Sequence, residues 1–210
     1  MNYLQLVQEL ARKAGVSGRP AAVTNQTGEM LRLVNWINQA WLDIQNERAD
    51  WSFMWTSGQT DTVAGSQTAV LLPDCRAIAP DTVYLGATKL EVVGWSTFDQ
   101  LYRRQTTQGQ PRACSIRPDG LLALSPIPDA VYTINYDYFK KPSLMAEVTD
   151  VPGALPERFH NAIVWLAMKY YGEYEQDGDV VTIANAGYRK EALLMANELL
   201  PNIQLNWSFV

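Results

Sequence analysis

Apolar residues near the start of the chain recur at the spacing of an amphipathic helix. The first such segment, residues 2–14, is followed by Gly15, a residue type common just beyond a helix end. The second begins after Thr27, a candidate N-cap. Its apolar stripe comprises Met30, Leu33, Val34, Ile37, Trp41 and Ile44. The pattern therefore predicts two helices within residues 1–54.

Residues 55–142 carry shorter apolar runs separated by turn signals. The runs on either side of residues 64–66 predict one hairpin, and those on either side of residues 117–120 predict another. A short helix is predicted at 96–105, with a capping box at its start. The clearest strand places Tyr132, Ile134, Tyr136 and Tyr138 on one face and ends at Pro142. This part of the chain is predicted to form a small, mostly antiparallel β module.

Helical periodicity returns in residues 143–200. Pro156 suits the first turn of a third helix, and Pro201 ends a fourth. The apolar stripe of the fourth comprises Val180, Ile183, Ala184, Tyr188, Leu194 and Leu199. Helices at both ends with strands between them predict an α+β fold. Its helical bundle has about four helices, and the antiparallel β module is inserted between the second and the third.

The final ten residues, 201–210, alternate apolar and polar side chains although they follow a helix-ending proline. This period of two predicts an extended arm. The residues predicted to bind a partner are Ile203, Leu205, Trp207, Phe209 and Val210. The alternative is that the arm folds back over its own helices and completes their core.

Composition excludes several functional classes. The chain has 210 residues, of which 47% are hydrophobic and 19% charged, as in an ordinary globular protein. Its net charge of −5, with basic residues clustered no further than in pairs, argues against tight nucleic-acid binding. No secretory signal and no bilayer-spanning apolar run are evident, so we expect an intracellular protein without a membrane partner. Cys75 and Cys114, far apart in the chain, are expected to be free thiols.

The usual signs of catalysis or ligand binding are weak. His160 is the only histidine, and no nucleophile motif accompanies it. Acidic residues crowd at 173–179, between two predicted helices, where a solvated turn is the simpler interpretation. The aromatic run at 50–58 is expected to cap the core, although a carbohydrate platform is the alternative. We therefore predict no catalytic, cofactor-binding or metal-binding residues, and a protein that is not an enzyme.

The order of elements and three local patterns resemble the head-to-tail adaptor, or connector, proteins of tailed bacteriophages. These patterns are "LVNWINQAWLDIQ", "PIPDAVYTINYDYFKKP" and "LPERFHNAIVWLAMKYY". The resemblance covers nearly the whole chain. It implies a structural virion protein at the head-tail junction, assembled in the host cytoplasm as a dodecameric ring beneath the portal. The implied partners are the portal protein, a tail or nozzle protein and further copies of the chain, while genomic DNA only passes through the channel.

The resemblance also implies that the C-terminal arm reaches the portal and that the β module faces outward or toward the tail. Two other interpretations stay open. One is another tail-junction component, such as a stopper or tail-completion protein. The other is a carbohydrate-binding or cell-wall-cleaving accessory that uses the acidic turn and the aromatic residues.

Overall fold

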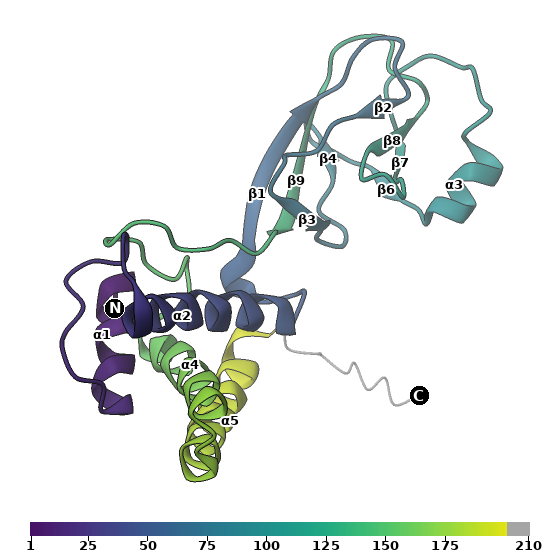
Figure 1. The fold of residues 1–210 in the computed structure, drawn as a ribbon. Coiled ribbons are helices and arrows are strands. Elements are labelled where there is room, and N and C mark those ends of the chain that lie inside the picture. Colours follow the sequence, from purple (N-terminus) through teal and green to yellow (C-terminus); the bar gives the residue numbers. More distant parts are fainter. Residues whose placement is uncertain (201–210) are drawn as a thin grey trace, which may run out of the picture. The chain divides into compact units, whose positions relative to one another are not determined.

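A computed structural model describes residues 1–200, and the chain divides into two compact units (Figure 1). The helical unit comprises Met1–Met54 and the chain from Pro142 onward, and the β unit comprises Trp55–Lys141. Each unit has its own hydrophobic core. Five α-helices and two small sheets in the described part confirm the α+β class. The predicted arm, with Ile203, Leu205, Trp207, Phe209 and Val210, lies outside the described residues.

Helix α4 is the shared packing partner in the helical unit. The α-helices of this unit are α1 (Tyr3–Ala14), α2 (Gly28–Glu47), α4 (His160–Glu175) and α5 (Gly178–Leu199), with short 3-10 turns at Ser52–Met54 and Glu157–Phe159. α4 packs against α1, α2 and α5, whereas α5 packs chiefly against α4. The fully buried side chains include Leu6, Leu10, Leu33, Ile37, Ile44 and Ile163. Because α5 has one main neighbour, only part of its surface can be covered.

Local chemistry explains where the first two helices begin and end. The Asn2 side chain accepts a hydrogen bond from the Gln5 N–H, and the Gln5 side chain accepts one from the Asn2 N–H, which completes a capping box. Gly15 ends α1 with a φ of 69°, a conformation that glycine adopts without steric cost. Thr27 precedes α2 as predicted, although its side chain makes no capping bond.

Two glycines allow α4 and α5 to approach closely. A Cβ atom at Gly187 of α5 would lie 2.5 Å from the Trp165 indole of α4. A Cβ atom at Gly172 of α4 would lie 2.8 Å from a methyl group of Val180. Neither side can gain a methyl group without displacing its neighbour, so glycine is required at both contacts.

The β unit contains two sheets. Its elements are β1 (Trp55–Asp61), β2 (Thr68–Ala69), β3 (Cys75–Ile78), β4 (Tyr84–Leu85), β5 (Thr88–Lys89), β6 (Glu91–Val92), α3 (Trp95–Leu101), β7 (Ala113–Ile116), β8 (Leu122–Ser125) and β9 (Thr133–Lys140). In the first sheet β9 is central, with β1 on one side and β3 and β4 on the other, and β5 pairs with β4. The second sheet has the order β2-β8-β7-β6, in which β6 and β7 are parallel.

The structure confirms some strand predictions and corrects others. β7 and β8 form the predicted hairpin, in which Gly120 has a φ of 83° and its N–H donates to the Arg117 carbonyl. Ile134, Tyr136 and Tyr138 of β9 share the buried face, as predicted. The hairpin predicted around residues 64–66 is wrong, because β1 pairs with β9 and β2 with β8. The seven-residue ladder between β1 and β9 offers more hydrogen bonds than the local turn does.

Candidate interaction surface

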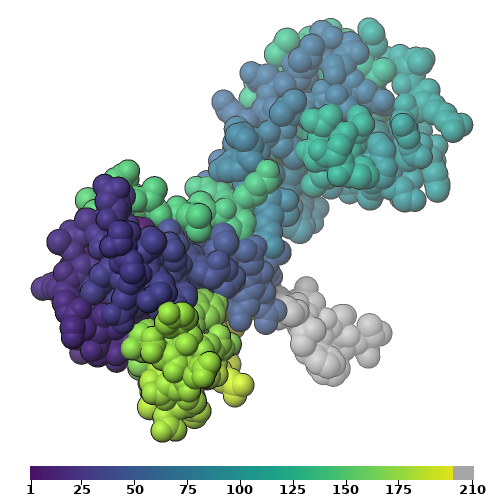
Figure 2. Space-filling model, in the orientation of Figure 1, coloured from purple at the N-terminus to yellow at the C-terminus, as the bar shows by residue number. Residues whose placement is uncertain are grey.

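Helix α5 exposes apolar side chains along the face that α4 does not cover. Its buried residues are Ala184, Met195 and Leu199. Ile183, Leu193 and Leu194 are 58%, 64% and 47% exposed. In Figure 2 the yellow-green atoms of the α4–α5 pair lie at the surface of the helical unit.

This face corrects one expectation from the sequence. Ile183 and Leu194 were expected on the inward stripe, but they are exposed and Met195 is buried in their place. Positions 183 and 194 are eleven residues apart, which is three helical turns, so both project from the same side of α5. A helix with apolar residues on two sides is typically packed against other protein surface on both sides. We call Ile183, Leu193 and Leu194 the outer face of α5.

Two tyrosine hydroxyls hold α4 and α5 against α2. The Tyr188 hydroxyl of α5 donates to Glu47 Oε2 at 2.7 Å. One turn earlier on α2, Asp43 Oδ2 accepts from the Tyr170 hydroxyl of α4 at 2.6 Å. Burial, together with these carboxylates, raises the pKa of both phenols, so each stays a protonated donor. The outer face is thus presented by a helix whose orientation is held at several points.

A groove with cationic rims lies beside the outer face. It has a volume of about 490 Å³ and is formed by the end of α2 together with α4 and α5. Its apolar lining includes Leu166, Leu193 and Ala196. Arg48 and Arg189 also line it, and neither has an ion-pair partner in the part of the chain that the structure describes. We call this pocket the basic groove.

The turn between α4 and α5 gathers exposed carboxylates, as predicted. Gln176 adopts a left-handed conformation that ends α4, and Asp177 caps α5 by accepting from the N–H groups of Asp179 and Val180 at 3.0 Å each. Its carboxylates belong to Glu173, Glu175, Asp177 and Asp179. Their exposure and the capping geometry describe a solvated turn rather than a pair of catalytic acids. We call residues 173–179 the acidic tip.

The excess of negative charge belongs to the helical unit. That unit carries nine Lys and Arg residues against fourteen Asp and Glu, whereas the β unit carries eight of each. The net charge of −5 therefore comes entirely from the helical unit. Against this background, the cations around the basic groove form a local exception.

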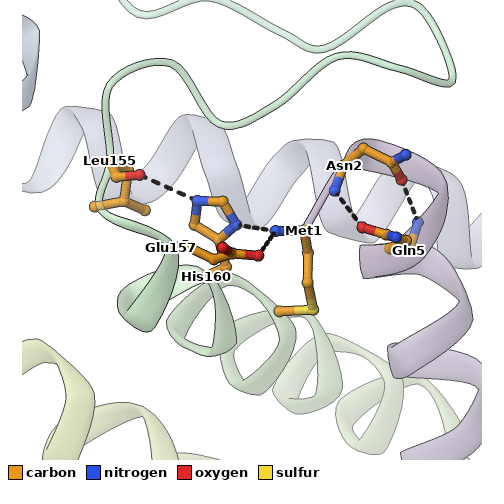
Figure 3. A network of polar contacts seen from close by, with 6 residues as sticks. All are labelled: Met1, Asn2, Gln5, Leu155, Glu157 and His160. Atoms are coloured by element: carbon orange, nitrogen blue, oxygen red, sulfur yellow. Dashed lines mark hydrogen bonds and ion pairs between the residues drawn. The ribbon is translucent and has the colours of Figure 1, made fainter.

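His160 has a structural environment at the start of α4 (Figure 3). Its Nε2 lies 3.1 Å from the Leu155 carbonyl oxygen, which can only accept, so Nε2 carries the proton. Nδ1 then accepts from the amino group of Met1 at 2.7 Å, and that amino group also donates to Glu157 Oε1 at 2.9 Å. No Ser, Thr or Cys side chain is among these partners. The ring links the beginnings of α1 and α4 as a neutral imidazole.

Acidification is expected to destabilise the helical unit through His160. Burial lowers the pKa of this imidazole, so below pH 6.5 the unfolded chain binds a proton that the folded chain resists. The contribution of neutral His160 to the free energy of unfolding is fully present above that pH. It decreases below that pH by at most about 1.4 kcal/mol per pH unit. Urea titrations followed by circular dichroism at 222 nm, at pH 7.5 and 5.5, measure the loss.

The variant His160→Gln keeps a donor for the Leu155 carbonyl and removes the titration. Its stability is expected to be the same at the two pH values. The pKa of Glu157 is lowered mainly by its hydrogen bond to the terminal amino group. The stability that depends on ionised Glu157 is therefore lost only below about pH 4.5, outside the range of this experiment. An equal loss in both proteins would contradict the assignment to His160.

Neither the two cysteines nor the aromatic run at 50–58 shows the features of a reactive centre in the described part of the chain. Cys75 and Cys114 are free, as expected, and burial raises the pKa of Cys114 to about 12. Trp51 is buried, and its indole N–H donates to the Ile44 carbonyl, so this part of the aromatic run caps the helical core. Within residues 1–200, no group of His, Cys, Asp and Glu side chains is arranged to hold a metal ion. No helix in this range is long and apolar enough to cross a membrane.

Comparison with protein families decides the class of protein. The family model described as SU10 adaptor protein matches residues 1–206. The chain belongs to this family of phage head-to-tail adaptors. A search of curated proteins found no match. Members of this family are structural proteins, so the chain is a structural phage protein that contacts other virion components.

Sequence reasoning found the acidic tip and missed the other two surfaces. The outer face of α5 left a signal, since apolar residues occupy adjacent positions at 183 and 184 and again at 194 and 195. The basic groove left none, because Arg48 and Arg189 are far apart in the chain and meet only in the folded helical unit. The predicted partner-binding residues of the arm are not among those that the structure describes.

Proposed function

We propose that the chain is a head-to-tail adaptor that forms a ring beneath the portal and links it to the tail, leaving a channel for DNA. The outer face of α5 carries this proposal. Isolated exposed apolar residues are normal, but Ile183 and Leu194 on one side of α5, with Leu193 next to them toward the basic groove, favour a contact with another protein. In a ring, the neighbouring copy would cover this face, and the four helices α1, α2, α4 and α5 would act as the packed bundle of each subunit.

The charge of the helical unit supports a channel for DNA that does not bind it. Binding to duplex DNA requires cations that neutralise phosphates on one face. The helical unit has five more acidic than basic residues, so a channel wall made from it would repel the backbone. DNA would then slide past without being held. The ring would be assembled in the host cytoplasm and be retained in the virion.

The arm is proposed to dock on the portal. Its alternating sequence suits addition to a sheet edge or binding along a groove, with Trp207 and Phe209 as anchors. Family membership supports a docking role for the arm, because an adaptor must hold more than one virion component.

Truncation after Leu200 is expected to abolish addition to the portal. Native mass spectrometry of the portal mixed with full-length chains should show a fixed ring stoichiometry, and with the truncated form only free portal. Binding that survives truncation unchanged would contradict the role of the arm. If neither form binds, the adaptor proposal itself is wrong.

The truncated protein also tests whether the arm belongs to its own core. If the arm folds back over its own helices, truncation should lower the free energy of unfolding of the isolated chain. We expect no change, because the described helices already enclose a continuous core without the arm. Urea titration of both forms measures the difference.

A further inference from the structure

We infer that neighbouring copies join head to tail, the acidic tip of one entering the basic groove of the next. The inference rests on the proposed ring and names the two surfaces that meet in it. Both belong to the helical unit, and all of their residues are described by the structure.

The basic groove fits an acidic partner with an apolar centre. Its floor is apolar, at Leu166, Leu193 and Ala196, and would bury a non-polar side chain. Arg48 directly follows the last residue of α2, Arg189 lies in α5, and neither has an ion-pair partner among residues 1–200. Glu47, the carboxylate that also lines the groove, already accepts the hydrogen bond from Tyr188. The groove therefore offers two uncompensated positive charges beside apolar surface.

The acidic tip has the complementary chemistry. Tyr174 is half-exposed and supplies an aromatic anchor, a residue type enriched at interface centres. Its inner side is held against Trp36, with ring centroids 5.6 Å apart, while Arg32 lies 4.6 Å from its ring. Glu175 is exposed beside it and has no ion-pair partner in the described chain. Glu173 is different, because it already contacts Lys169, a third cation of the groove lining, at 3.6 Å.

Within one copy, Glu173 is the one carboxylate of the acidic tip that contacts a cation of the groove lining, Lys169, among the described residues. The other carboxylates of the tip cannot reach Arg189. Both surfaces are built on the same α4–α5 pair, which the close contacts at Gly172 and Gly187 hold together. Asp179 and Arg189 lie ten residues apart on one helix, about 15 Å along its axis, and a continuous helix cannot fold back over that length. The occupant must be another molecule, and a second copy carries the matching charge.

Two different surfaces that bind each other generate a directional contact. When such a contact repeats around a rotation axis, it closes into a ring, whereas a contact between identical patches stops at a dimer. The acidic tip and the basic groove are different patches of one subunit. This pairing therefore gives the kind of interface that a ring requires.

The test uses exchange of charge between the two surfaces in the full-length chain. Glu175→Arg alone and Arg189→Glu alone should each weaken self-association roughly tenfold, because each places like charges in contact. An equimolar mixture of the two variants should recover the wild-type association, since every contact then pairs opposite charges. The double variant E175R/R189E should recover it too. Sedimentation velocity over a range of protein concentrations measures all four.

A matched control separates local contact from net charge. Glu147→Arg, in the exposed loop before α4, changes the net charge as Glu175→Arg does and should leave association unchanged. Additive losses in the double variant, or no recovery in the mixture, would overturn the inference. So would full-length chains that stay monomeric throughout. Addition to the portal in a fixed ring stoichiometry would still support the proposed function in that case, so the two failures can be told apart.

Discussion

The double variant Ile183→Ser and Leu194→Ser is expected to weaken association between copies roughly 10- to 150-fold while the helical unit stays folded. Both side chains are about half exposed in the single chain, so a neighbouring copy can still bury the remainder. Burying an isoleucine or leucine completely contributes about 1.5–3 kcal/mol, and half of that at two sites sums to about 1.5–3 kcal/mol. Such a loss corresponds to roughly 10- to 150-fold in affinity. Sedimentation velocity at several concentrations measures the change.

A control variant shows whether any loss of exposed apolar surface has the same effect. Val63 and Val70 of the β unit are 63% and 71% exposed, and changing both to serine removes a similar amount of apolar area. This variant should associate as the wild type does. If both double variants behave alike, or if the α5 variant associates normally, the outer face is not the contact between copies.

Ile163→Ala is expected to destabilise the helical unit by about 3 kcal/mol. Ile163 is fully buried in α4, the helix that α1, α2 and α5 all contact. Truncation there loses the transfer free energy of three carbon atoms and leaves a cavity that three neighbouring helices cannot easily fill. Urea unfolding followed by circular dichroism at 222 nm reports mainly on this unit, because most helical residues belong to it.

Ile183→Ala is the matched control for that measurement. It makes the same chemical change on α5 at a side chain that is 58% exposed. Its stability should stay within about 0.5 kcal/mol of the wild type, because little burial is lost and alanine has the higher helix propensity. If the two variants lose comparable amounts of free energy of unfolding, the assignment of Ile163 as buried and Ile183 as exposed is wrong.

The helices could be located from the sequence because their signals are local. Gly15 ends α1 and Thr27 precedes α2 where the pattern placed them, since the conformation of a helix end depends on adjacent residues. The turn at Gly120 was found for the same reason. The cap of α3 was not, because Gly94 precedes this helix in place of the predicted Ser96.

Strand pairing was less accessible because it joins residues far apart in the chain. β1 is followed closely by β2, yet its partner is β9, and the register joins Trp55 to Phe139. Thr88–Lys89 and Glu91–Val92 are separated by one residue, yet they supply β5 to the first sheet and β6 to the second. Alternation shows that a segment is extended and which residues share a face, but not which strand lies beside it.

For the candidate site, the sequence by itself determined that α5 is an apolar helix, that acidic residues form the turn before it and that the arm alternates. The tertiary structure decided which apolar residues of α5 meet α4 and which face outward, because that depends on how many neighbours the helix has. It also brought Arg48 to the side of Arg189. Periodicity is a property of one segment, whereas exposure and charge complementarity depend on several segments packed together.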